Sequence, residues 1–295
     1  AGLIAIAGTG PWRRLHVRTP LALAGEDRAY GTLEMRAFPM ETEEMRMANP
    51  AGTPIWYELL TPHPDAAQDF YTHVVGWTIA PSNHPGMDYR IISTPDGVPV
   101  AGLLKQPDGM TAGPVWLSYL AVADVDAAVD AIERAGGATH MPTMTIDGVG
   151  RMALGADPQG ATLYVMRGES AEESLAFRQA EEATPGHAVW NELSAKNPEA
   201  ALDFYAAAFG WRQDGAMPMG ELGDYRFVSC GTTRLGAIMG EVPNGRIGWQ
   251  YYFMVADIDA AQQRLASAGG KTIQGPDQIP GGSFALVCED PHGAR

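Results

Sequence analysis

The chain contains a long internal repeat. Residues 52–77, GTPIWYELLTPHPDAAQDFYTHVVGW, return 134 positions later at 186–211 as GHAVWNELSAKNPEAALDFYAAAFGW, without a gap and with about half of the residues identical. A second pair follows the first: WLSYLAVADVDAAVDAIERAGGAT at 116–139 returns as WQYYFMVADIDAAQQRLASAGGKT at 249–272. Chance does not produce such matches. The repeat constrains the fold most strongly, because the repeating segment is the unit that folds and stacks.

The four segments alternate as A, B, A′ and B′, and each unit is about 60 residues long. Unit A begins with an extended run at 54–60, rich in aromatic and branched residues, which predicts a strand. Apolar residues then recur with the i, i+3, i+4 spacing of a helix packed on one face, at Ala67, Phe70, Tyr71, Val74 and Val75. Gly76 ends this helix. Strand-like segments complete every unit, so each unit is predicted to be βαβββ.

A single βαβββ unit exposes a sheet face that it cannot bury alone, so the units must pair. Pairing A with B and A′ with B′ predicts an α+β protein of four modules in two domains. We place the first domain at residues 51–168, a linker at 169–184 and the second domain at 185–295. Residues 1–50 are expected to be a non-native or disordered leader, in which a stray strand could form at 15–18.

Charge and composition restrict the partner. The net charge is −15, from 20 basic and 35 acidic residues, and it would repel nucleic-acid phosphates and anionic lipid. No apolar run approaches the roughly 20 residues that span a bilayer. Two cysteines cannot form a disulfide framework. We therefore expect a cytoplasmic monomer or homodimer whose partner is a small molecule, with no nucleic-acid or membrane partner.

The motifs WYEL…PDAAQDFYTHVVGW, AVADVDAAVDAIERAGG and DPQGATLYV, with their second copies, cover residues 50–295 in order. Together they resemble the vicinal oxygen chelate (VOC) superfamily of glyoxalase I, extradiol dioxygenases, and fosfomycin- and bleomycin-resistance proteins. The tandem arrangement is most similar to the two-domain glyoxalase-like antigen subgroup. The resemblance implies U-shaped mixed sheets, with modules paired within one chain or across a dimer.

The resemblance also implies that a last strand follows each DPxG turn. The second module continues after DPQG with ATLYVMRG, whereas only Ala294 and Arg295 follow DPHG in the fourth. We therefore expect the last strand of the fourth module to be absent from the chain. The second domain is then expected to be less stable than the first.

The resemblance implies a divalent metal ion held by His, Gln or Glu side chains. These ligands lie on the first strand of each unit and on the strand after DPxG. The matching positions hold Trp56, Leu117, Trp190 and Tyr164, which are not ligands for such an ion. Gln250 is a ligand type of some glyoxalases, but Trp190 removes its partner. We expect no metal and no cofactor; a divalent metal in the second domain is the alternative.

Strand alternation places Trp56 and Glu58 on one face of the sheet, and Trp190 and Glu192 repeat this. Since Trp56 stands at the family's ligand position, this face is expected to line a pocket. The predicted ligand-binding residues are Trp56, Tyr119, Tyr164, Trp190, Gln250 and Tyr252.

Glu58 and Glu192 are the catalytic candidates. A carboxylate beside an indole in a half-buried cleft should have a raised pKa, which suits a general base. The alternative is that both carboxylates accept hydrogen bonds from neighbouring strands and fix strand pairing. Asp88-Tyr89-Arg90 also recurs, as residues 224–226, and Arg90 could bind an anion or lie on an exposed strand.

Two functions follow as hypotheses. The first is metal-free binding of a planar or hydrophobic small molecule in aromatic-lined clefts. The second, implied by the resemblance, is a glyoxalase-like lyase or a dioxygenase acting on a small carbonyl or aromatic substrate. The antigen subgroup also suggests a surface-associated interaction protein, but the sequence carries no export signal in its support.

Overall fold

The structure is a computed structural model that describes residues 3–7, 47–82, 87–107, 113–242 and 245–295. The candidate strand at 15–18 lies outside these residues. The described residues form two eight-stranded mixed sheets with four α-helices, α1 (Pro64–Val75), α2 (Val125–Arg134), α3 (Pro198–Phe209) and α4 (Ile258–Ser267). None of these helices is long and apolar enough to cross a membrane.

The first sheet is built from modules A and B. Its strands are β2 (Pro54–Thr61), β3 (Thr78–Pro81), β4 (Tyr89–Ser93), β5 (Pro99–Lys105), β6 (Val115–Ala121), β7 (Ala138–Ile146), β8 (Gly150–Ala156) and β9 (Thr162–Gly168). Their order is β3-β4-β5-β2-β6-β9-β8-β7. Each module contributes four neighbouring strands, and the modules join where β2 pairs antiparallel with β6. The modules therefore pair within one chain.

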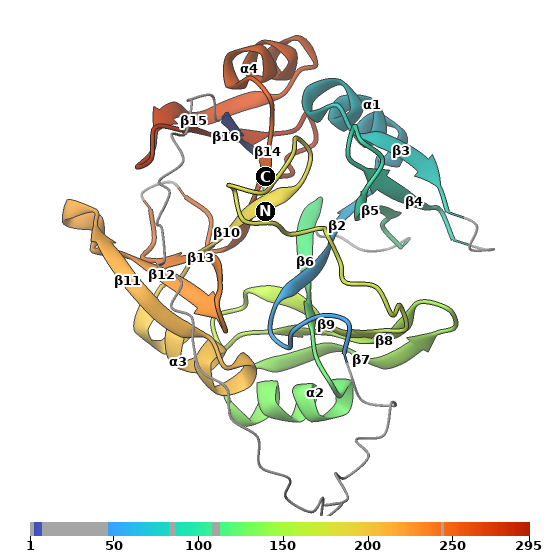
Figure 1. The fold of residues 1–295 in the computed structure, drawn as a ribbon, viewed down its shortest axis with the longest axis vertical. Coiled ribbons are helices and arrows are strands. Elements are labelled where there is room, and N and C mark those ends of the chain that lie inside the picture. Colours follow the sequence, from blue (N-terminus) through green and yellow to red (C-terminus); the bar gives the residue numbers. More distant parts are fainter. Residues whose placement is uncertain (1–2, 8–46, 83–86, 108–112, 243–244) are drawn as a thin grey trace, which may run out of the picture. The chain divides into compact units, whose positions relative to one another are not determined.

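The second sheet repeats this arrangement with one change. Its strands are β10 (Ala188–Ser194), β11 (Arg212–Pro218), β12 (Asp224–Cys230), β13 (Thr233–Met239), β14 (Gly248–Met254), β15 (Lys271–Gln278), β16 (Phe284–Glu289) and β1 (Leu3–Ala7). Their order is β11-β12-β13-β10-β14-β1-β16-β15. Figure 1 shows β1, in dark blue, among the orange and red strands of the fourth module.

Strand β1 takes the place of the last strand that the fourth module lacks. Ala5 pairs with Phe253 on β14 and with Leu286 on β16, just as Val165 of β9 pairs with its two neighbours in the first sheet. The expectation of a disordered leader is therefore wrong for residues 3–7. Without β1, the facing backbone groups of β14 and β16 would be left unpaired. Strand β1 fills the position of the missing last strand. The reason to expect a less stable second domain is therefore removed.

The helices form where the apolar spacing predicts them. All five residues of the predicted stripe on α1 are buried. Gly76 then ends the helix with φ of 88°, a left-handed conformation that glycine adopts without steric cost. Asn197 caps α3 by accepting a hydrogen bond from the backbone N–H of Ala200.

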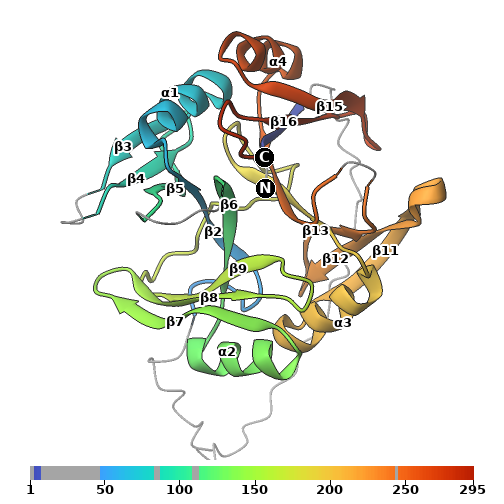
Figure 2. The ribbon, with the colours of Figure 1, turned by 180° about the vertical axis from the view of Figure 1, so that it is seen from behind.

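The two sheets share one hydrophobic core. Tyr57 on β2 is fully buried, packs edge-on against Tyr251 of β14, and donates a hydrogen bond to Asn191 Oδ1 on β10 at 2.8 Å. Two buried indoles cross between the halves: Trp77 Nε1 donates to a backbone oxygen at residue 186, and Trp211 Nε1 donates to one at residue 52. Helix α1 lies beside α4, and α2 beside α3 (Figures 1 and 2). This packing uses the sheet faces that carry the helices and leaves the opposite faces to the candidate sites.

Candidate functional site

Glu58 lies in the middle of the first sheet, on the face turned away from the shared core. Its neighbours in sequence, Tyr57 and Leu59, belong to that core, so alternation along β2 directs the carboxylate to the other side. The residue is only 2% exposed. Tyr119 on the adjacent strand β6 donates a hydrogen bond to Glu58 Oε2 at 3.0 Å. The second oxygen, Oε1, is buried and has no hydrogen-bond partner in the described part of the chain.

Aromatic side chains surround this carboxylate. The rings of Tyr119 and Tyr164 stack with their centroids 4.2 Å apart, joining β6 to β9. On the other side, Trp56 Nε1 donates to the hydroxyl of Tyr89 at 2.9 Å. Apolar residues of the same face, among them Leu60, Leu117 and Met152, pack around Tyr119 and Tyr164. The first domain therefore holds one buried acidic group among aromatic and aliphatic side chains.

Burial sets the protonation of this group. Loss of water raises the pKa of Glu58 to about 7, and the nearby hydroxyls of Tyr119, Tyr89 and Tyr164 oppose this rise. Burial and the nearby carboxylate raise the pKa of the same three tyrosines. The phenols therefore remain hydrogen-bond donors at neutral pH. The carboxyl group, in contrast, titrates close to neutral pH.

The second domain carries a related group at Glu192. Tyr225 and Tyr252 both donate to Glu192 Oε2, at 2.6 and 2.8 Å. Gln250 Nε2 donates to Oε1 at 3.2 Å, and Trp190 Nε1 donates to the Tyr225 hydroxyl at 2.7 Å. Burial raises the pKa of Glu192 above its ordinary value. Unlike Glu58, both oxygens of Glu192 have partners.

The structure thus brings together the residues predicted from sequence, three around Glu58 and three around Glu192. Their roles in binding or catalysis stay predictions. Sequence reasoning missed Tyr89 and Tyr225, which reach the two carboxylates from β4 and β12. The recurring Asp-Tyr-Arg triplet carried the signal, but only its arginines were considered.

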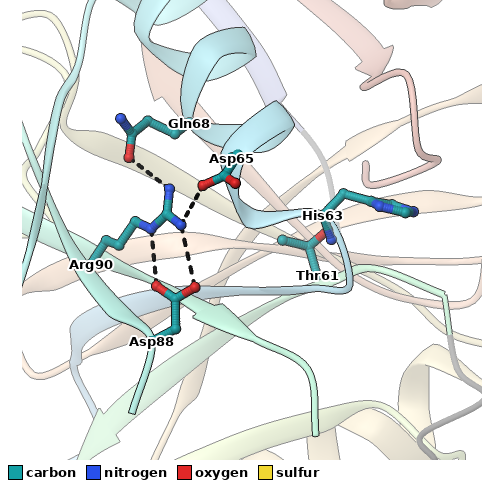
Figure 3. A network of polar contacts seen from close by, with 6 residues as sticks. All are labelled: Thr61, His63, Asp65, Gln68, Asp88 and Arg90. Atoms are coloured by element: carbon teal, nitrogen blue, oxygen red, sulfur yellow. Dashed lines mark hydrogen bonds and ion pairs between the residues drawn. The ribbon is translucent and has the colours of Figure 1, made fainter. Parts of the chain in front are cut away.

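Figure 3 shows Arg90 of β4 in contact with Asp65, Gln68 and Asp88. Its guanidinium contacts Asp65 at 2.6 Å and Asp88 at 3.1 Å, and donates to Gln68 Oε1 at 2.9 Å. Asp65 and Gln68 lie in α1, so the network ties the strand that carries Tyr89 to the first helix. Arg90 is therefore occupied by two carboxylates and is not presented to an anionic ligand.

Gly102 on β5 makes room for the Tyr89 ring, because a Cβ at this position would collide with the Tyr89 hydroxyl. We expect Gly102→Ala to displace Tyr89 from Glu58 and to lower the free energy of unfolding by about 1–3 kcal/mol. Urea denaturation measures this loss. Gly113→Ala is the matched control, since a Cβ there meets no atom within 4 Å. Equal stability of the two variants would contradict the placement of Tyr89.

Comparison with known proteins identifies the fold family. The model of the Glyoxalase/Bleomycin resistance protein/Dioxygenase superfamily matches residues 53–165 and again 184–295. The chain belongs to this superfamily. It is 36% identical over 250 residues to "Putative glyoxylase CFP32" of Mycobacterium tuberculosis, covering 82% of this chain and 92% of that protein. It is 34% identical over 265 residues to the anthracycline biosynthesis protein DnrV of Streptomyces peucetius, covering 82% and 91%.

Solved structures of the superfamily share the fold. The 2,3-dioxygenase LapB from Pseudomonas sp. KL28 aligns with a TM-score of 0.57 at 13% identity, over 83% of this chain and 91% of that one. The Mn(II)-bound glyoxalase from Novosphingobium aromaticivorans aligns with a TM-score of 0.53 at 17% identity, over 83% and 87%. The α+β architecture of tandem glyoxalase-like domains predicted from sequence is thereby confirmed.

A metal ion such as the Mn(II) of the Novosphingobium glyoxalase does not fit the residues that the structure describes. Among the described residues, no group of three or more His, Cys, Asp and Glu side chains could hold a metal ion. The carboxylate of Glu58 is instead surrounded by tyrosines with raised pKa values, which are poor ligands while protonated. Gln250, the remaining ligand type, donates its amide to Glu192 and Tyr252. The described residues around Glu58 therefore offer hydrogen-bond donors rather than a set of metal ligands.

Proposed function

We propose that this protein binds a small, planar organic molecule on the tyrosine-lined face of the first domain, without a metal. The observation that carries the proposal is the buried Oε1 of Glu58, for which the described part of the chain provides no hydrogen-bond partner. An unsatisfied buried polar atom costs about 1–3 kcal/mol, and more when it is charged. Folded proteins keep few such atoms, and a ligand that donates to Oε1 would remove the cost.

The surroundings of Glu58 indicate the ligand class. The stacked rings of Tyr119 and Tyr164, together with Trp56, favour a flat aromatic partner. The polar group that the ligand needs is a hydrogen-bond donor for Glu58. DnrV is named as an anthracycline biosynthesis protein. A hydroxylated anthraquinone, which is planar and carries phenolic O–H groups, is therefore the first ligand class to test.

Titration with hydroxylated anthraquinones and naphthoquinones tests the proposal. We expect saturable binding by isothermal titration calorimetry, with quenching of tryptophan fluorescence as a second readout. Glu58→Gln should weaken binding by about 10-fold, because a hydrogen bond to a charged acceptor, worth about 1.5–3 kcal/mol, becomes one to a neutral amide, worth about 0.5–1.5 kcal/mol.

The exposed Glu199→Gln serves as the control and should bind like the wild type. The proposal would be abandoned if no compound of the panel bound saturably. It would also fail if Glu58→Gln bound as tightly as the wild-type protein.

A second function is favoured by the pKa of Glu58, which burial raises to about 7. A group whose pKa lies near neutral pH suits proton abstraction next to a carbonyl, as a glyoxalase-like lyase requires. Turnover by metal-depleted protein that disappears in Glu58→Gln would favour this reading. Stoichiometric Ni, Zn, Fe or Mn in untagged protein would contradict metal-free chemistry and favour the dioxygenase alternative.

We propose that this function operates in the cytoplasm, in a monomer or a homodimer. Pairing of β2 with β6 and of β10 with β14 completes both sheets within one chain. The acidic composition agrees with a small-molecule partner.

A further inference from the structure

The two sites differ at one position beside the carboxylate. Glu58 on β2 pairs across the sheet with Leu117 on β6, and Glu192 on β10 pairs in the same way with Gln250 on β14. Residues paired in this way point to the same face and their side chains touch. The carboxylate therefore faces an aliphatic side chain in the first domain and a carboxamide in the second.

The difference between Leu117 and Gln250 decides whether both oxygens of the neighbouring carboxylate have a hydrogen-bond partner. Gln250 Nε2 lies 3.2 Å from Glu192 Oε1 and 3.3 Å from the Tyr252 hydroxyl, so one amide supplies the donor that Oε1 needs. Leu117 is buried, 3% exposed, and has no donor to give. Glu58 Oε1 accordingly has no hydrogen-bond partner among the residues that the structure describes.

We propose that Gln250 stands in for the donor group of a ligand, so that the first domain alone binds a ligand and the second is closed by its own side chain. The ligand must then present an N–H or O–H group to Glu58 Oε1, as the Gln250 amide does to Glu192. This inference rests on the function proposed above and narrows it. It also reassigns Trp190, Gln250 and Tyr252 from ligand binding to a closed hydrogen-bonded cluster.

Exchanging the two side chains tests the proposal. With a hydroxylated anthraquinone as titrant, we expect one binding site per wild-type chain. Leu117→Gln should weaken binding by at least ~10-fold, because the new amide competes for Oε1. Gln250→Leu should raise the number of sites per chain from one to two. Gln213→Leu, an exposed glutamine on β11, is the control and should leave the count at one.

A readout without ligand separates this inference from the proposed function. Infrared difference spectroscopy of the carboxylic acid C=O stretch follows protonation of the buried glutamates. The added amide in Leu117→Gln should lower the pKa of Glu58, and its removal in Gln250→Leu should raise the pKa of Glu192, because a donor stabilises the charged form.

Each outcome is decisive. Two sites in the wild type, or one site in Gln250→Leu, would overturn the inference, as would unchanged carboxylic acid spectra in both variants. If the spectra shift as expected but no titrant binds the wild type, the donor exchange stands and the proposed function fails. The Gln250→Leu variant keeps the test valid if Leu117→Gln does not fold.

Discussion

Phe253→Ala is expected to unfold both halves of the protein together, at a cost of about 3–5 kcal/mol in the free energy of unfolding. Phe253 lies on β14 of the second sheet and is fully buried. Its ring centroid lies 4.9 Å from that of Trp77, 5.2 Å from Trp116 and 5.6 Å from Tyr57, all residues of the first domain. Removing the ring opens a cavity between the two sheets rather than within one of them.

Urea denaturation followed by tryptophan fluorescence and by far-ultraviolet circular dichroism measures this effect. The two signals should change in a single transition, shifted to lower urea in the variant. Phe284→Ala, on β16 of the same sheet, is the matched control because its side chain is 37% exposed, and it should cost at most about 0.5–1 kcal/mol. Two separate unfolding transitions in the variant, with the first shifted to lower urea and the later one unchanged, would show that the halves do not share a core.

Local patterns in the sequence were sufficient to predict the modules. The repeat located four βαβββ units, and the apolar spacing on α1 agrees with its five buried positions. Alternation along β2 also placed Glu58 and Tyr57 on opposite faces, as the structure has them. Each of these features depends on residues close together in the chain, where periodicity is informative.

Features that depend on distant partners were not predictable in this way. Strand β1 pairs with β14 and β16, which lie more than two hundred residues further along the chain, and no periodicity in the leader marks it. The hydrogen bond from Tyr57 to Asn191 joins the two repeats at equivalent positions. Its donor and acceptor are different residue types, Tyr and Asn, so the alignment of the repeats shows only a substitution there.

The candidate site was predictable in its members but not in its hydrogen bonding. Leu117 and Gln250 occupy equivalent positions in the aligned repeats, and the Gln250 side chain carries a hydrogen-bond donor. Only the structure shows that this donor reaches Glu192 Oε1 and that Glu58 Oε1 has no hydrogen-bond partner among the described residues. The difference between the two sites is therefore a property of the paired strands.

The stability of the protein is expected to fall as pH rises from about 4.5 to about 7 through the titration of Glu58. Its pKa is raised by burial from 4.5 to about 7 in the folded state. Below pH 4.5 the group is protonated in both states, and its contribution to stability is complete. Between the two values the folded state holds a proton that the unfolded state has released, so stability is lost as pH rises. The total is about 3 kcal/mol, and the loss levels off above the folded pKa.

Comparing the wild type with Glu58→Gln between pH 4.5 and 8 isolates this effect. The variant has no titrating group at this position, so its stability relative to the wild type should rise with pH by up to about 3 kcal/mol. Burial lowers the pKa of His187, so this residue makes the stability of the protein increase as pH rises. His187 is present in both proteins, and its effect cancels in the difference. Tyr119→Phe removes a hydrogen bond that lowers the pKa of Glu58, so its stability should go on falling to a higher pH than that of the wild type. Parallel curves for the wild type and Glu58→Gln would show that the carboxyl group does not titrate in this range, and the case for its action as a base at neutral pH would be lost.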